Sequence, residues 1–465
     1  MNVSLPALEI ADFNLRRVAA WGGVLAASLL LAVFTFYFPL WMLAASLALV
    51  AAMVAVFVNP YLGSLAMLFL IYSRLLQSFD IGKIFTGVVI LTAAAWIANM
   101  LVKADFRVLV LRRQTALIFA FLFPVFLSIF FAADLKLAFA ATAIYFKMIL
   151  LYILFVSLLT TPRRFELGIY TVILALVVAV GYGFYTYLIR PSVVTFIFRR
   201  AAGGGTDPNF FALSILSFLP IPFLFVFAEK RFGRKLFWVG TVLLMIAGIV
   251  ISFSRAGMLG LAFVLLLLGY KIRRHRLLLV LAAVLFVVLL FFLPEAVWER
   301  MGTLSRAGKD DSLRWRFKLL LGSWDLFLTH PFTGIGAGNM VLYSYRWINQ
   351  HQVAHNTYLE MMAEFGIGAI VIFGLLVRTT FRYLRGSYKY FADNLRPRLA
   401  IIGEGLEVGL LGFLFVSLFL SLHYEYMFWV FLGLAGAMRK MAEEENARLK
   451  TGNAALRSKP VFQPS

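Results

Sequence analysis

The sequence predicts an all-α polytopic membrane protein, and three observations support this fold class. Of 465 residues, 62% are hydrophobic and only 14% are charged, whereas a soluble domain carries about 25% charged residues. Apolar runs recur along most of the chain, and many are long enough for a helix to cross a bilayer. Basic residues gather between alternate runs. The composition therefore excludes a soluble globular enzyme, a disordered chain and a coiled coil.

About fourteen transmembrane helices are expected, with twelve as the lower bound. Each run lies between charged or Pro- and Gly-rich breaks, and the third is short enough to be tilted or re-entrant. The predicted spans are 18–37, 40–57, 62–73, 84–102, 115–132, 137–160, 168–189, 210–227, 236–252, 256–270, 277–293, 358–377, 401–422 and 425–438.

The charge pattern predicts the orientation, because Lys and Arg are enriched in cytoplasmic loops. With the N-terminus inside, both termini are cytoplasmic and residues 294–357 lie outside. Topology thus accounts for the net charge of +21, and no nucleic-acid partner is expected. The inside loops then hold Lys103, Arg107, Arg112, Arg113, Arg163, Arg164, Lys230, Arg231, Arg234, Lys235, Lys271, Arg273, Arg274 and Arg276, together with the basic stretch 378–398.

Four regions follow from this topology. Residues 1–293 form an N-terminal transmembrane helix bundle, and 294–357 form the one long hydrophilic loop between spans. Residues 358–438 supply the C-terminal transmembrane helices, and 439–465 form a polar cytoplasmic tail.

The long loop contains a predicted amphipathic helix over 312–330. Asp311 and Ser312 are suitable N-caps, and Pro331 ends the helix. The helix is expected to lie on the membrane surface or to pack on the bundle. Its apolar stripe consists of Leu313, Phe317, Leu320, Trp324, Phe327 and Leu328, and the turn that follows contains Gly334, Gly336 and Gly338.

Arginines on the outside are the informative charges, because insertion disfavours them there. Arg199 and Arg200 precede a Gly-Gly-Gly-Thr-Asp-Pro-Asn segment, and Arg255 lies in a Ser-Phe-Ser-Arg-Ala-Gly turn. A guanidinium makes bidentate bonds to phosphate oxygens, so one interpretation is an anion site. The other is that these side chains reach to the lipid head groups. Arg314 and Arg316, on the amphipathic helix, are open to the same two interpretations.

His355 is the candidate general base. It opens the sequence His-Asn-Thr-Tyr-Leu-Glu, where an outer aqueous cavity would meet the membrane. Histidine accepts a proton near neutral pH, although an interfacial histidine that only packs is the competing interpretation. His351, one helical turn earlier, is either an orienting partner or exposed.

Three further charges fall within predicted spans. Lys147 lies near the middle of its span, where a charge is costly, and Glu360 and Glu364 are one helical turn apart. A Lys147–Glu364 ion pair is one hypothesis for them. The chain has no Cys, and His351 and His355 have no obvious third ligand, so no metal or other cofactor is expected.

The order of these motifs resembles the bacterial O-antigen ligase and O-antigen polymerase superfamily. An outside Arg precedes Gly and Asp-Pro-Asn, and a Ser-Arg-Ala-Gly turn follows. A long loop then carries "THPFTGIGAGN" and closes with "HNTYLEMMAEFGIGAI". The motifs span roughly residues 195–375.

The resemblance implies a glycosyltransferase of the bacterial inner membrane with GT-C-like helical architecture and a periplasmic active site. Such enzymes take a glycan from undecaprenyl diphosphate. A ligase transfers it to lipid A–core, and a polymerase transfers it to another lipid-linked repeat unit. Fourteen spans exceed the usual twelve of the ligases, which leaves the subtype open.

The resemblance also implies roles for single residues. His355 corresponds to the family's periplasmic histidine, and Arg255 to its second arginine. Arg200 best fits the first arginine, with Arg199 in contention. Arg316 fits the loop arginine, with Arg314 as the competitor.

The expected chemistry is a metal-independent inverting displacement. Arginines would stabilise the charge that grows on the diphosphate, and His355 would accept the proton of the acceptor hydroxyl. The alternative function is a polysaccharide flippase or other transporter, which would favour internal repeats and a charged path along the midplane. A scaffold protein would leave the outside arginines unexplained.

Overall fold

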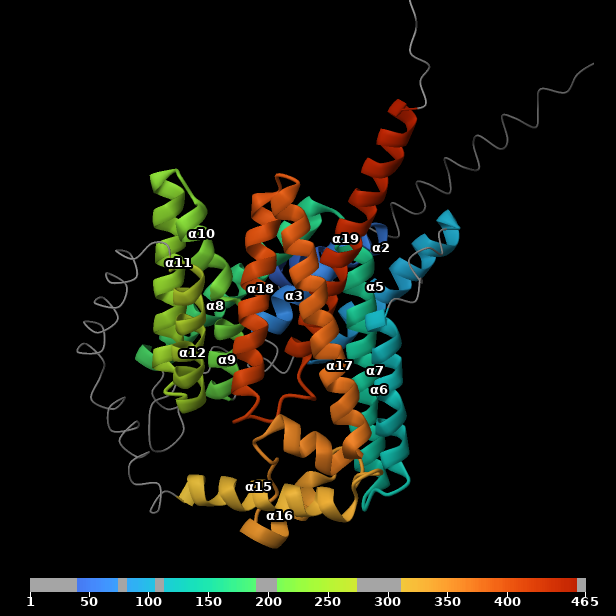
Figure 1. Ribbon diagram of the computed structural model, residues 1–465, viewed down its shortest axis with the longest axis vertical. Helices are drawn as coiled ribbons and strands as arrows, with labels where there is room; N and C mark the ends of the chain where they lie inside the picture. Colours follow the sequence, from blue (N-terminus) through green and yellow to red (C-terminus); the bar gives the residue numbers. More distant parts are fainter. Residues whose placement is uncertain (1–39, 74–81, 105–112, 190–206, 274–310, 458–465) are drawn as a thin grey trace, which may run out of the picture. The chain divides into compact units, whose positions relative to one another are not determined.

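The computed structural model describes residues 40–73, 82–104, 113–189, 207–273 and 311–457, and all regular structure in these ranges is helical (Figure 1). The helices are α2 (Leu40–Val58), α3 (Pro60–Ser73), α5 (Gly82–Lys103), α6 (Arg113–Ile129), α7 (Leu135–Leu158), α8 (Pro162–Ile189), α9 (Pro208–Phe218), α10 (Pro220–Ala228), α11 (Phe232–Ile251), α12 (Arg255–Lys271), α15 (Asp311–Thr329), α16 (Met340–Ile348), α17 (Thr357–Asp393), α18 (Pro397–Val416) and α19 (Tyr426–Arg457).

The predicted fold class agrees with this helical architecture. Every predicted span within the described ranges coincides with a helix or a helix pair, and the spans 18–37 and 277–293 lie outside those ranges. Seven of the described helical segments are long and apolar enough to cross a membrane. The chain is thus an all-helical polytopic membrane protein, and the total of fourteen spans stays a prediction.

The chain divides into two compact units, residues 1–59 and residues 60–465. The described helix of the first unit is α2, which is apolar along its whole length. The second unit contains α3 to α19 and the continuous core of the protein. Its largest fully buried side chains are aromatic: Tyr72, Tyr145, Tyr152, Phe155, Phe165, Phe211, Phe218, Phe225, Phe253, Phe365, Phe391 and Phe413.

One predicted span contains two helices in succession. Residues 210–227 form α9 and α10, which meet at Leu219 and Pro220, and the Leu219 backbone stays in the helical region. Pro220 lacks the N–H that would continue the hydrogen-bond ladder, but Pro208–Ala228 still forms one apolar span. This segment packs against α18, where a Cβ on Gly409 would clash with the Ser217 carbonyl. Glycine on α18 therefore permits the two backbones to approach closely.

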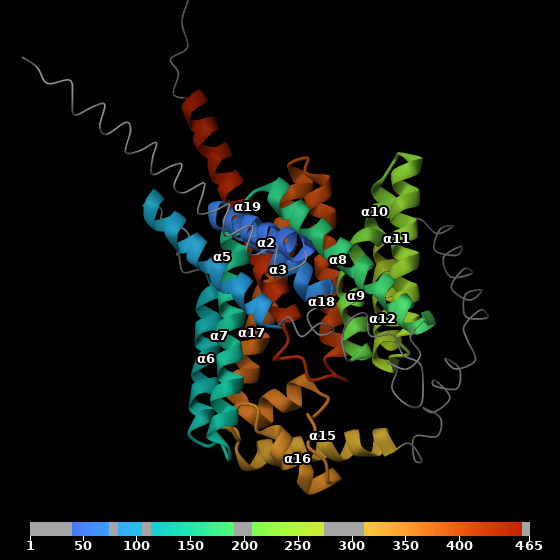
Figure 2. The same cartoon turned by 180° about the vertical axis from the view of Figure 1, so that it is seen from behind.

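The turns of the second unit gather at two opposite ends. At the "His355 end", the α6–α7 turn bonds the segment before α16, through Asp134 N–H and Asn339 Oδ1 at 2.8 Å. At the "basic end", Lys271 Nζ lies 2.9 Å from Glu404 Oε1, and α12 thereby meets α18. The segment 311–357 lies at the His355 end in both views (Figures 1 and 2). The predicted outside and inside turns thus separate to opposite ends, and which end faces the cytoplasm stays a prediction.

The helix predicted over 312–330 is α15, and it lies across the His355 end of the bundle (Figure 1). One face packs on a small apolar cluster formed with α16 and the start of α17. The opposite face exposes apolar side chains with helical spacing. The packed face presents Leu319, Ser323 and Leu326, and the exposed stripe consists of Phe317, Leu321, Trp324 and Leu328. The helix therefore packs on the bundle and keeps an apolar face that suits a membrane surface.

Candidate functional site

His355 lies in a tight turn immediately before α17. Its backbone is left-handed, with φ of 55°, a conformation that costs about 1–2 kcal/mol for a residue with a Cβ. The His355 N–H donates to Ser421 Oγ at 3.0 Å. Asn356 caps α17 by accepting from the backbone N–H groups of Tyr358 and Leu359, both at 3.0 Å. The cap and the Ser421 bond together fix the backbone position from which the imidazole extends.

A chain of amides orients the imidazole ring. Gln352 Nε2 donates to Gln350 Oε1 at 3.0 Å, so Gln352 Oε1 faces the ring. The distance from that oxygen to His355 Nε2 is 3.3 Å. An amide oxygen can only accept, so Nε2 carries the ring proton in this arrangement. The lone pair that could take a proton is then on Nδ1.

The surroundings of His355 keep its ring neutral. Burial, and next the Arg316 guanidinium, lower the pKa of His355 to about 4, and Asp207 opposes them. Both lowering causes penalise the imidazolium, because it would be desolvated beside a like charge. The free protein therefore holds a neutral His355 well below neutral pH.

The Asp-Pro-Asn and Ser-Arg-Ala-Gly motifs meet at the same end. Asp207 caps α9 by accepting from Asn209 N–H at 2.7 Å. Asn209 Oδ1 then accepts from Ser254 Oγ at 2.8 Å. Ser254 in turn caps α12 by accepting from Gly257 N–H at 3.1 Å. Asn209 therefore joins the start of α9 to the cap of α12, and Asp207 lies within electrostatic reach of His355.

The predicted arginines have different environments. Arg255 is the first residue of α12 and is only 9% exposed. On α15, Arg316 is half-buried and near enough to His355 to affect its pKa, whereas Arg314 is exposed. Arg199 and Arg200 lie outside the described residues. The structure thus brings Arg316 and Asp207 to His355, and it puts Arg255 beside Ser254, whose hydroxyl bonds Asn209.

Helix α17 breaks at Gly366, near the start of the predicted span. The residue has φ of 74° and ψ of −173°, which a side chain would strain. Space forbids one as well, because a Cβ would lie 2.7 Å from the Pro331 carbonyl oxygen. That oxygen accepts from Ile367 N–H at 2.7 Å. The loop after α15 therefore accepts a hydrogen bond from an N–H group that the break leaves without a partner in its own helix.

The same loop takes over two carbonyls of the broken helix. Ile335 N–H donates to the Ala363 carbonyl at 3.0 Å, and Gly336 N–H donates to the Glu364 carbonyl at 3.2 Å. The glycines of the loop adopt positive φ values between 65° and 100°. The motifs "TGIGAGN" and "AEFGIG" thus bond each other where the loop after α15 meets the break in α17. The glycines permit the backbone conformations that these bonds require.

Glu360 holds the turn that carries His355. Its buried carboxylate accepts from Ala354 N–H at 2.8 Å and from Ser421 Oγ. Ser421 is the residue that also accepts the His355 N–H. A hydrogen bond contributes about 0.5–1.5 kcal/mol net, so the two bonds together are comparable with the cost of the strained backbone of the turn. Glu360 therefore positions His355 through Ser421.

Glu364 joins two loops. Its carboxylate accepts from Met340 N–H at 3.2 Å and from the Tyr424 hydroxyl at 2.6 Å. The Tyr424 hydroxyl in turn accepts from Gly338 N–H at 2.7 Å. His423 Nε2 lies 3.4 Å from the Glu364 carboxylate. Glu364 thus ties the glycine-rich loop to the α18–α19 turn.

The hypothesis of a Lys147–Glu364 ion pair is wrong. Lys147 is exposed on α7, whereas Glu364 is 1% exposed and bonded to Tyr424. Glu360 and Glu364, one helical turn apart, both bond the α18–α19 turn, through Ser421 and Tyr424. Their partners on the α18–α19 turn were missed, because no sequence motif marks that turn.

The comparisons with known proteins cover this part of the chain. Residues 240–374 match the family model for O-antigen ligase, which confirms the resemblance inferred from the motifs. The match contains Arg255, Arg316 and His355. The teichuronic acid biosynthesis protein TuaE of Bacillus subtilis (strain 168) is 33% identical over 125 residues, which is 26% of this chain. The alignment spans 25% of that relative.

Proposed function

We propose that this protein is a glycosyltransferase of the inner membrane, of the O-antigen ligase and polymerase type. It transfers a glycan from an undecaprenyl-diphosphate-linked donor to a hydroxyl group of an acceptor at the periplasmic face. The observation that carries the proposal is the environment of His355, where a neutral imidazole lies within electrostatic reach of Arg316. The family match over the same residues supports it.

The reaction is a single displacement. The acceptor oxygen attacks the anomeric carbon while its proton passes to His355 Nδ1. The bond from that carbon to the diphosphate oxygen breaks, and its electron pair stays on the diphosphate. One displacement inverts the anomeric centre. The energy comes from the donor, so no nucleoside triphosphate is needed.

Arginines bind the diphosphate in this proposal. Arg255 and Arg316 contribute from α12 and α15, and Arg200 or Arg199 contributes from the segment before α9. Arg314 is the alternative to Arg316 on α15. Negative charge on the diphosphate grows as the bond breaks, so cations in a partly desolvated site favour the transition state over the ground state. The mechanism uses no metal ion.

Donor binding should also strengthen the base. Arg316 lowers the pKa of His355 in the free protein. A bound diphosphate brings negative charge next to Arg316 and reduces that influence. The pKa of His355 then rises toward its ordinary value, and the base becomes stronger once the donor is in place.

The test uses purified protein, a lipid-linked glycan donor and EDTA. Transfer to lipid A–core would identify a ligase, and lengthening of the lipid-linked glycan would identify a polymerase. Arg255→Ala should abolish transfer, and Arg255→Lys should recover only part, because an ammonium lacks the bidentate fork. Exposed Arg378→Ala is the matched control. Full activity of Arg255→Ala, or loss of wild-type activity in EDTA, would contradict the mechanism.

A further inference from the structure

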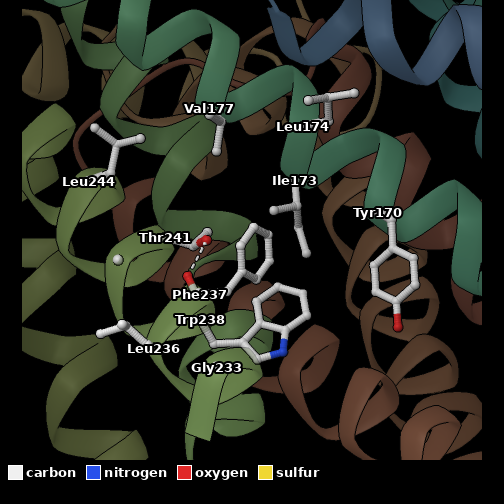
Figure 3. A pocket seen from close by; sticks show the side chains of 11 residues that line it. Tyr170, Ile173, Leu174, Val177, Gly233, Leu236, Phe237, Trp238, Thr241 and Leu244 are labelled. Carbon is white, nitrogen blue, oxygen red and sulfur yellow. Dashed lines mark hydrogen bonds between the residues drawn. The ribbon is translucent and has the colours of Figure 1, made fainter.

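An apolar groove of about 800 Å³ lies between α8 and α11, on the half of these helices next to the basic end (Figure 3). It is lined by side chains from 170–177 of α8 and 233–244 of α11. The Thr241 hydroxyl adds little polarity to the groove, because it donates to the Phe237 carbonyl at 2.9 Å. The groove has the size of ligand sites, which run to about 300–1,000 Å³, and its surface suits hydrocarbon.

Two glycines of α11 leave this space open. A Cβ on Gly233 or Gly240 would meet no atom within 4 Å. Gly248, further along the same helix, differs, because a Cβ there would lie 2.7 Å from Val180. Small residues usually serve close helix packing in membranes, and Gly248 fits that role. Gly233 and Gly240 instead deepen the groove.

Arginines stand at the rim of the groove. Arg398, at the start of α18, lies close to the hydroxyl of Tyr170, which lines the groove. Glu229 lies 3.2 Å from Arg234 and 3.7 Å from Arg398, and so holds the two guanidinium groups together. The adjoining turns add Lys230, Arg231, Lys235 and Arg396. Glu166 also lies near Arg398 and Arg396, so the six cations outnumber the two carboxylates and the rim is basic on balance.

We propose that this groove binds an anionic glycerophospholipid of the membrane leaflet at the basic end. An acyl chain lies between α8 and α11, beside Gly240, and the lipid phosphate lies against Arg234 and Arg398. Basic residues at a membrane surface attract anionic lipids by about 1 kcal/mol each, and a guanidinium pair binds phosphate in a defined geometry. The site is at the opposite end from His355, so its lipid is not the reacting donor.

An apolar segment of the chain itself, 277–293, is the competing occupant. It follows Arg273, Arg274 and Arg276. Placed in the groove, it would bring these cations to a rim that is already basic. A phospholipid brings the opposite charge, so charge complementarity favours the lipid.

The first test fills the groove. Purified protein in nanodiscs is labelled with a photoactivatable phosphatidylglycerol carrying its reactive group on the acyl chain. Gly240→Leu should lower labelling of α8 and α11 at least tenfold, because the side chain occupies the acyl-chain space. Gly87→Leu on α5 is the control, since a Cβ there also meets nothing within 4 Å. Equal labelling of Gly240→Leu and the control would overturn the proposal.

The second test concerns the head group. The wild type should be labelled more strongly by the phosphatidylglycerol probe than by a matched phosphatidylcholine probe. The double variant Arg234→Gln and Arg398→Gln should lose this preference, and Lys103→Gln on α5 should keep it. Equal labelling of the wild type by both probes would overturn the proposal. So would a disulfide between Leu244→Cys and Ala283→Cys that forms in high yield, because it would assign the groove to 277–293.

Discussion

Carboxylates make different kinds of contact at the two ends of the second unit. At the basic end they pair with cations: Arg385 Nε lies 2.6 Å from Glu407, and Lys271 bonds both Glu407 and Glu404. At the His355 end, Glu360 and Glu364 accept from backbone N–H groups and hydroxyls. The basic end thus uses carboxylates to join helix ends, and the His355 end uses them to hold loops around one imidazole.

This difference predicts at which end a substitution should cost more stability and activity. At the basic end Glu404 is partly exposed, so loss of its ion pair leaves groups that water can solvate, and the cost is small. A lost carboxylate at the His355 end leaves buried donors unsatisfied, which is costly. It also frees the turn that carries His355. Function should therefore respond to changes at one end far more than at the other.

The largest expected contrast is in accessibility from outside the cell. Gln350 is an exposed residue at the His355 end, and Asp393 is exposed at the basic end. Gln350→Cys should react with a membrane-impermeant maleimide in intact cells, and Asp393→Cys should react only after lysis. The chain has no Cys of its own, so the unsubstituted protein is the control. Labelling of Asp393→Cys alone in intact cells would invert the predicted orientation.

His355→Ala should lower the transfer rate by about 10²–10⁴-fold, the usual contribution of a positioned base. Donor binding should survive, because the arginines hold the diphosphate. His351→Ala is the matched control: His351 is exposed, and its Nδ1 lies 3.0 Å from the Val341 carbonyl. The initial rate with saturating lipid-linked donor measures both. A wild-type rate for His355→Ala would remove the base from the mechanism.

Glu360→Gln should lower kcat roughly tenfold, because an amide offers one acceptor oxygen in place of two and disturbs the bonds that fix the His355 turn. The KM for the donor should change little, since Glu360 positions the base and does not touch the diphosphate. Glu404→Gln at the basic end is the counterpart and should stay within about twofold of wild type. If the two variants lose activity equally, the contrast between the ends is wrong.

The pH profile should show the smallest change in rate, but it reports the pKa of His355 most directly. The rate depends on neutral His355, so kcat/KM should stay level as pH falls and decline only near pH 4, the pKa in the free protein. The decline in kcat, which reports the donor complex, should lie at higher pH. Arg316→Gln removes a cause of the lowered pKa and should move the kcat/KM decline toward pH 6.5. A decline of wild-type kcat/KM near pH 6.5 would contradict the neutral, buried imidazole.

The sequence by itself determined the helical membrane class and the approximate place of nearly every described helix. Both are local properties, since apolar length and flanking charge can be read without knowing which helices touch. It also singled out His355, Arg255 and Arg316, because each departs from a local expectation of charge or position. The α15 helix could be predicted for the same reason, because its cap and its terminating Pro331 are its neighbours in the sequence.

Only the tertiary structure decided how these residues work together. The contact between Gly366 and the loop at Pro331, and the bonds from Glu360 through Ser421 to His355, connect segments far apart in the chain. Sequence spacing cannot show such bonds, because their geometry depends on how helices pack. The lowered pKa of His355 has the same origin, since burial and the approach of Arg316 exist only in the folded protein.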